Sequence, residues 1–247
     1  MSKPQIVIVP GAWHAPFYMA TVVSNLESLG YTIHAQQMPA VGSSNPPSDL
    51  STDVAALNSM VEKAIDAGND VVVICHSWGG MVTGSGLMGL SKAEREQKGK
   101  KGGVIRTGYM TAFIVDIGVS MMDAAGGKPA PWFGIQVSHL FPFCLDPNVL
   151  YNDLPPAEQQ KWGEKLQCHA YDTFYAKATA ASWKKIPTNY LLCEDDLAIP
   201  REGQQAMIEG VKAVGADIEV TSIKVGHSPF LSKVDETVAW IVGVAGR

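Results

Sequence analysis

Short runs rich in Val, Ile and Leu recur along the chain, separated by segments whose apolar residues return every three or four positions. Continuous apolar runs of this kind are typical of strands buried on both faces of a parallel sheet. They predict strands at residues 5–9, 31–37, 70–75, 104–110, 188–193 and 217–223.

The segments between the strands are predicted to be amphipathic helices. The segment that precedes the third strand has an apolar face made of Val54, Leu57, Val61 and Ile65. The C-terminal segment has a similar face, made of Val234, Val238, Ile241 and Val242. Strands that alternate with helices in this way predict the α/β class, with a mostly parallel central sheet and helices on both faces.

The alternation stops between residues 116 and 186, where the composition shifts to Pro, Met and aromatic residues. A connection of this length is too long for an ordinary loop between two strands. Its aromatic content argues against disorder. We therefore expect an α/β core formed by residues 1–115 and 187–247, with residues 116–186 inserted as a lid (cap) that has its own short helices.

The net charge and the hydrophobic content indicate the size of the core and the kind of partner that is unfavourable. The 247 residues carry a formal net charge of -5, and 46% of them are hydrophobic. A single domain with a large core is expected. Nucleic acid is an unfavourable partner, because proteins that bind it concentrate Lys and Arg on one surface. The mixed-charge stretch at residues 92–101 is interpreted as a solvated helix end and loop.

The first four residues lead directly into the first predicted strand, so no secretory signal is recognised and we expect a cytoplasmic protein. No apolar run is long enough to cross a bilayer, and we expect no membrane partner. The cysteines show no CxxC pair and are interpreted as reduced thiols, and we expect neither a metal nor a cofactor. These cysteines are Cys75, Cys144, Cys168 and Cys193.

The strongest chemical signal is Ser77. It follows the buried strand at 70–75, and the small residues Gly79 and Gly80 then open a helix. A sharp turn from strand to helix is the arrangement of a nucleophile elbow, in which a serine hydroxyl projects beyond the sheet toward a base. The alternative is that Ser77 only caps the helix. The hydrophobic strand before it favours the elbow.

Candidates for the base and the acid follow later strands. His227 comes after the last strand, and a histidine oriented by a carboxylate can move a serine proton. Three carboxylates, Glu194, Asp195 and Asp196, follow the strand at 188–193, where solvated turn residues are also common. A further candidate acid is Asp116, after the fourth strand. The order Ser, acid, His is the order that this elbow motif requires.

The other histidines fall into two groups. His14 and His76 are on turns predicted to lie near the elbow and are expected to contact substrate. His34, His139 and His169 are interpreted as structural or pocket-forming residues.

In these motifs the chain resembles the α/β-hydrolase superfamily, in particular small lid-bearing esterases such as plant methyl esterases and the related hydroxynitrile lyases. The resemblance covers nearly the whole chain, with Cys75 where the elbow usually begins with Gly and Pro10 where the family's oxyanion loop has His. It implies an α/β-hydrolase fold. It also selects Asp196 as the acid, because Pro200 follows four residues later.

The resemblance implies a catalytic triad of Ser77, Asp196 and His227, with the amides of Ala12 and Trp78 as the oxyanion hole. An aromatic lid is suited to an apolar substrate, so we expect a serine hydrolase that cleaves a small or medium ester, thioester or lactone. Trp132 and Phe133 are predicted, with His14 and His76, to contact it.

Two alternatives stay open. The first is a lyase of the hydroxynitrile-lyase type. It is disfavoured because those relatives carry Thr at the position of Gly11 and Lys at the position of Ser228. The second is a non-catalytic receptor for a small ligand on the same fold. The sequence does not fix the oligomeric state, and a homodimer is one of the options.

Overall fold

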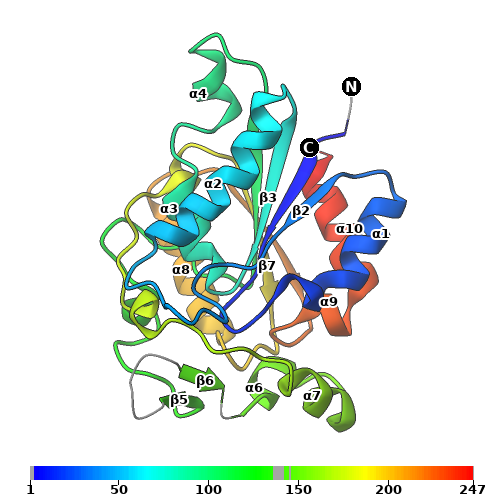
Figure 1. Cartoon of the computed structure of the whole chain (residues 1–247), viewed down its shortest axis with the longest axis vertical. Helices are drawn as coiled ribbons and strands as arrows, with labels where there is room; N and C mark the ends of the chain where they lie inside the picture. Colours follow the sequence, from blue (N-terminus) through cyan, green and yellow to red (C-terminus); the bar gives the residue numbers. More distant parts are fainter. Residues whose placement is uncertain (1–2, 136–141, 145, 247) are drawn as a thin grey trace.

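The computed structural model of the protein describes residues 3–135, 142–144 and 146–246. Its centre is a six-stranded sheet in the order β2-β1-β3-β4-β7-β8 (Figure 1), and every neighbouring pair of strands is parallel. The strands are β1 (Gln5–Val9), β2 (Ile33–Ala35), β3 (Asp70–His76), β4 (Gly103–Met110), β7 (Thr188–Cys193) and β8 (Ile218–Ile223).

All six predicted strands are present, and the predicted α/β fold is confirmed. The largest difference is at β2, which is only three residues long where the sequence pattern predicts residues 31–37. This strand lies at the edge of the sheet and pairs only with β1. The strands β1, β3 and β7 are almost entirely buried, as their continuous apolar runs predict.

Helices cover both faces of the sheet. Helices α1 (Ala20–Ser28) and α10 (Val234–Ala245) pack together on one face, on the right in Figure 1. Helices α2 (Ser51–Asp66), α3 (Gly79–Gly86) and α8 (Arg201–Ala213) lie on the opposite side. The apolar face predicted for α2 is buried through Leu57, Val61 and Ile65. None of the described helices combines the length and apolarity needed to cross a bilayer.

Two short helices complete the core. One is α9 (Pro229–Ser232), directly before α10, and the other is α4 (Lys92–Glu96). The mixed-charge stretch at residues 92–101 is a helix followed by a turn, as expected. Arg95 within it is buried and not solvated. Its guanidinium donates hydrogen bonds to the carbonyls of Ile65 and Gly102, so it fastens this loop to the core.

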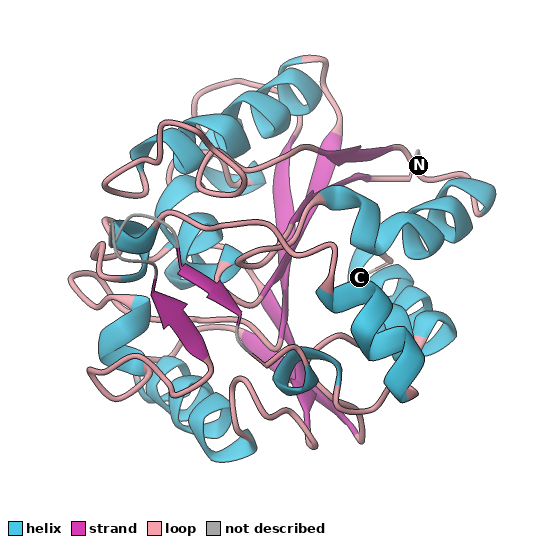
Figure 2. Cartoon of the chain, turned by 60° about the horizontal axis from the view of Figure 1, so that its bottom comes forward, coloured by secondary structure: helices cyan, strands magenta, loops and turns pink. Residues whose placement is uncertain are grey.

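The inserted segment gathers beyond the carboxyl ends of the strands, at the bottom of Figure 1 and nearer the viewer in Figure 2. It contains the expected short helices α5 (Met121–Ala124), α6 (Asn148–Tyr151) and α7 (Pro156–Gly163), and 3-10 turns at Tyr171–Phe174 and Ser182–Lys184. It also contains an antiparallel pair that the sequence pattern does not predict, β5 (Phe133–Ile135) and β6 (Pro142–Cys144). His139 lies outside the described residues.

The turn between β3 and α3 depends on close backbone contacts. A Cβ atom on Gly80 would lie 2.2 Å from the carbonyl oxygen of Phe113, and one on Gly79 would lie 2.6 Å from the carbonyl oxygen of Pro10. No side chain fits at either distance, so glycine is required at both positions. The Cys75 that replaces the family's first glycine is fully buried within β3.

These contacts predict opposite effects for two helical Gly→Ala substitutions. Gly80→Ala must displace backbone and is expected to lower the free energy of unfolding by about 2 kcal/mol. In Gly210→Ala, on α8, the new methyl group meets nothing within 4 Å. That variant should be more stable by about 0.5 to 1 kcal/mol, because alanine favours helix. Urea denaturation of both variants measures the difference, and equal stabilities would contradict the packing described here.

Candidate active site

Ser77 is held in an unfavourable backbone conformation at the point where β3 turns into α3. Its φ is 52°, in the left-handed region that a residue with a side chain rarely adopts. The backbone around it resists relaxation, because Ser77 donates its N–H to Met110 and its carbonyl accepts hydrogen bonds from Gly80 and Phe113. The strained turn is the elbow predicted from the sequence.

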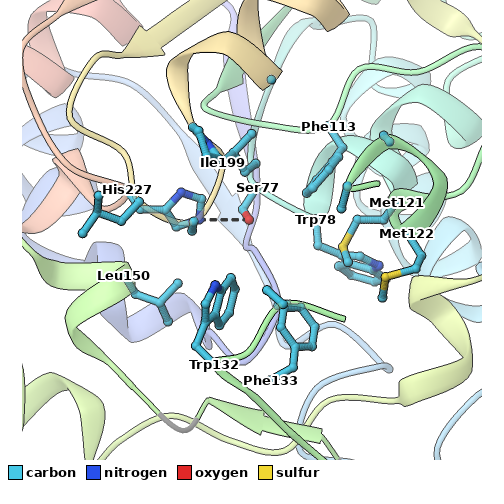
Figure 3. A pocket seen from close by; sticks show the side chains of 18 of the residues that line it. Ser77, Trp78, Phe113, Met121, Met122, Trp132, Phe133, Leu150, Ile199 and His227 are labelled. Atoms are coloured by element: carbon cyan, nitrogen blue, oxygen red, sulfur yellow. Dashed lines mark hydrogen bonds between the residues drawn. The ribbon is translucent and has the colours of Figure 1, made fainter. Parts of the chain in front are cut away.

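Three side chains from distant segments form one hydrogen-bonded series. The Nε2 of His227 lies 3.0 Å from the Oγ of Ser77, and its Nδ1 lies 2.7 Å from an Oδ2 of Asp196. The first contact is drawn in Figure 3. All three residues are buried to at least nine-tenths. Because a carboxylate only accepts hydrogen bonds, Nδ1 carries the proton and Nε2 presents its lone pair to the serine hydroxyl.

The Asp196 carboxylate is fully satisfied. Its Oδ1 accepts the backbone N–H groups of Ala198 and Ile199, at 2.7 and 2.9 Å. Its Oδ2 accepts the hydroxyl of Thr111 in addition to the N–H of His227. Thr111 was not identified from the sequence. It follows β4 in no recognisable motif, although its positive φ of 37° marks it in the structure.

Of the candidate acids, only Asp196 is hydrogen-bonded to His227. Glu194 points to the exposed edge of the sheet, where it accepts a hydrogen bond from Ser222. Asp195 is exposed. Asp116 forms an ion pair with Lys184 at the surface, with N and O 2.6 Å apart, and this pair lowers the pKa of its carboxyl group.

The predicted oxyanion donors lie beside Ser77. Ala12 and Trp78 both line the same cavity as Ser77 and His227. Within the described part of the chain, neither backbone N–H donates a hydrogen bond. Backbone at Gly11 packs so closely behind the elbow that a Cβ there would lie 2.9 Å from the Cβ of Ser77. The side-chain hydroxyl that the lyases carry at this position has no room here.

His14 and His76 lie behind the elbow and are not among the residues that line the cavity. The Nε2 of His76 donates to the backbone carbonyl of His227 at 2.9 Å. Burial lowers the pKa of His14 to about 3 and the pKa of His76 well below its usual value, so both are neutral imidazoles. Two of the other described histidines are also hydrogen-bonded, His34 to Gln5 and His169 to Thr173.

Ser77 opens into a cavity of about 370 Å³, within the range typical of sites for small molecules. Trp132 and Phe133, which the sequence predicts to contact substrate, line this cavity and pack in edge-to-face contacts on Trp13. Figure 3 shows further apolar side chains around the serine, which the sequence analysis missed. They are Phe113, Met121, Met122, Leu150 and Ile199. Among the described residues, no cluster of His, Cys, Asp and Glu could hold a metal ion.

Comparisons with known proteins agree with this geometry. A family model described as the alpha/beta hydrolase family matches residues 6–240. The alpha/beta hydrolase nvfD of Aspergillus novofumigatus is 33% identical, over 100% of this chain and 98% of that protein. The probable hydrolase R7 of a Phoma species is 30% identical, over 99% of this chain and 100% of that protein.

Solved structures show the same fold at lower identity. A pyrethroid hydrolase from Sphingobium faniae superposes with a TM-score of 0.74 at 18% identity, over 99% of this chain and 98% of that one. Polyneuridine aldehyde esterase superposes with a TM-score of 0.74 at 21% identity, over 98% of this chain and 99% of that one. Because the family model spans most of the chain and two relatives are at least 30% identical over nearly all of it, the chain belongs to the alpha/beta hydrolase family.

Proposed function

We propose that this protein is a serine hydrolase that cleaves an apolar ester, thioester or lactone through an acyl-enzyme on Ser77. The observation that carries the proposal is the buried series from Ser77 through His227 to Asp196, which ends at the wall of an apolar cavity. Structural relatives that are named a polyneuridine aldehyde esterase and an Arabidopsis methylesterase support the same reaction class.

In the first half-reaction, the Oγ of Ser77 forms a bond to the substrate's carbonyl carbon while Nε2 of His227 takes the hydroxyl proton. The carbonyl electron pair moves onto oxygen, and the resulting oxyanion accepts hydrogen bonds from the amides of Ala12 and Trp78. When the carbonyl re-forms, the bond to the leaving oxygen or sulfur breaks. The leaving group takes the proton from His227.

In the second half-reaction, water takes the place of the alcohol. His227 removes a proton from the water, whose oxygen bonds to the acyl carbon, and Ser77 leaves with the proton that His227 returns. Asp196 keeps the imidazole in one tautomer throughout and stabilises its charged form. The reaction is balanced without a cofactor: one water is consumed, and one acid and one alcohol or thiol are released, or a single hydroxy acid when the substrate is a lactone.

The position of His227 assigns a direction to each half of the substrate. His227 lies on one side of Ser77 in Figure 3, whereas Phe113, Met121 and Met122 lie on the other. Because His227 protonates the leaving group, that group must lie on the His227 side, beside Leu150. The acyl group then extends toward the methionines, whose flexible side chains fit irregular apolar shapes.

Covalent labelling tests the proposal. A fluorophosphonate probe should add to Ser77 of the native protein, because the probe requires an activated serine, and mass spectrometry should find no adduct in Ser77→Ala. A panel of short-chain aryl esters, thioesters and lactones should then be hydrolysed. Cyanide release from a cyanohydrin without ester turnover would favour the lyase, and absence of labelling with retained ligand binding would favour the receptor.

The hydrogen bond from the Thr111 hydroxyl to the Asp196 carboxylate predicts that a substitution at Thr111 lowers activity. Thr111→Val preserves shape but removes one donor from a buried carboxylate, so Asp196 and His227 should be held less firmly. We expect kcat to fall about tenfold, equivalent to one lost hydrogen bond to a charged group, with KM nearly unchanged. Steady-state kinetics measure this. Thr107→Val is the matched control, because Thr107 is a buried threonine on β4, the strand that ends just before Thr111, and its hydroxyl pairs with that of Thr188.

Enlarging one side of the cavity should change preference for one half of the substrate only. Met122→Ala should raise the kcat/KM of longer acyl chains relative to acetate by about tenfold, as removal of several buried methylenes allows. Leu150→Ala should instead shift preference among alcohols. Ratios between two substrates on one preparation cancel differences in active fraction. An acyl shift produced by Leu150→Ala and not by Met122→Ala would reverse the assignment.

A further inference from the structure

Both ring nitrogens of His14 are hydrogen-bonded, and their partners fix which nitrogen donates and which accepts. Its Nδ1 lies 2.7 Å from the backbone carbonyl oxygen of Ala12, and its Nε2 lies 2.9 Å from the hydroxyl of Tyr151. A carbonyl oxygen can only accept, so Nδ1 carries the hydrogen. Nε2 therefore has a lone pair and accepts from the tyrosine hydroxyl. The result is a chain of two hydrogen bonds, in which the Tyr151 hydroxyl donates to His14 and His14 donates to the Ala12 carbonyl.

This chain is buried and uncharged. His14 is 2% exposed and Tyr151 is fully buried. The ring of His14 is packed among Tyr18, His76 and Phe230, with centroids 4.5 to 6.0 Å from its own. With its pKa lowered to about 3 by burial, His14 keeps the neutral form that can donate at one nitrogen and accept at the other at every pH where esterases are assayed.

The acceptor at the end of the chain belongs to a strained turn. The carbonyl of Ala12 is part of the peptide bond to Trp13, whose φ is 63°. The N–H of His14 donates to the carbonyl of Gly11 at 3.3 Å, which closes the turn. A strained turn keeps its shape only when its surroundings hold it. By holding the Ala12 carbonyl, the imidazole of His14 limits rotation of Ala12, which lines the cavity and carries one of the two amides assigned to the oxyanion.

The other end of the chain belongs to the lid. Tyr151 is the last residue of α6. Two further lid segments form hydrogen bonds with the turn at residues 11–14 or with the 3-10 helix at Pro16–Met19 that follows it. The backbone N–H of Gln167 donates to the carbonyl of Trp13 at 3.0 Å. The hydroxyl of Tyr18 donates to the carbonyl of Trp162 at 3.0 Å. The lid therefore docks on the segment that supplies the Ala12 amide.

We propose that Tyr151 is a positioning residue that acts through His14, so that docking of the lid sets the orientation of the Ala12 amide for the oxyanion. The proposal depends on the serine hydrolase reaction proposed above. His14 does not act as a second base, because both of its nitrogens are used and it does not line the cavity. Neither residue touches the substrate.

Tyr151→Phe tests the proposal, because it removes only the hydroxyl at the lid end of the chain. We expect kcat for an aryl ester to fall about tenfold, less than the loss of roughly a hundredfold or more that follows removal of an oxyanion donor, because the amide is misdirected and not removed. KM should stay within about twofold. Inhibition by an aryl trifluoromethyl ketone should weaken by a similar factor, because this inhibitor forms an oxyanion on Ser77. Binding of the product carboxylic acid should be unchanged.

Tyr171→Phe is the control. It also removes one tyrosine hydroxyl from the segment 116–186, but this hydroxyl is paired with the hydroxyl of Tyr175 and does not belong to the chain that leads to Ala12. It should leave kcat and the affinity for the ketone within about twofold of the native values. Thermal unfolding of both variants separates a loss of stability from a loss of transition-state binding.

The outcomes are distinguishable. Equal effects of the two variants on kcat and on ketone affinity would overturn the positioning role, while labelling of Ser77 by the fluorophosphonate would leave the hydrolase reaction standing. Failure of the native protein to react with either reagent would overturn the hydrolase reaction itself and the positioning role with it. A decrease in stability of Tyr151→Phe with unchanged ketone affinity would assign Tyr151 a structural role only.

Discussion

The buried carboxylate of Asp196 is the constraint on which the site depends. A carboxylate removed from water is costly unless its lone pairs are satisfied, and here two backbone amides, one hydroxyl and one imidazole satisfy them. The donors come from the ends of β4 and β7 and from the loop after β8. Their convergence fixes the plane of His227, and therefore the direction in which its free nitrogen faces Ser77.

The parallel sheet makes this convergence possible. Because β3, β4, β7 and β8 are neighbours and run in the same direction, the residues that follow them emerge together at the carboxyl ends of the strands. Gly79 lets the start of α3 approach the end of β1 and Pro10 closely, and this contact brings the turn after β1 beside the serine. Apolar side chains from residues 116–186 lie at the same end of the strands, so Ser77 faces a cavity lined mainly by apolar residues.

The sequence was sufficient to predict the features that depend on local pattern. Strands buried on both faces, the elbow at Ser77 and the order of serine, acid and histidine all leave a signal in consecutive residues. The choice of Asp196 over Glu194 and Asp195 needed the resemblance, because side-chain direction at the end of a strand depends on the turn that follows. In the structure, Asp196 is the one whose carboxylate receives the amides of Ala198 and Ile199.

Features that depend on tertiary contacts were missed. Thr111 has no motif of its own, and its role exists only because β4 and β7 are adjacent. Met121 and Met122 line the cavity because the lid folds back over the serine, and the pairing of β5 with β6 is equally non-local. His76 precedes Ser77 directly and His14 follows the first strand, but both imidazoles lie behind the elbow and bond to backbone carbonyls instead of lining the cavity.

The central claim is that Ser77 and His227 act as one unit, and a double-mutant cycle on kcat tests it most directly. Residues that act together lose nearly all of their contribution when either one is removed. The account predicts that Ser77→Ala, His227→Ala and the double variant are impaired to about the same extent toward one aryl ester, with the same residual rate. Losses that multiply in the double variant would show that the two residues act independently and would contradict the account.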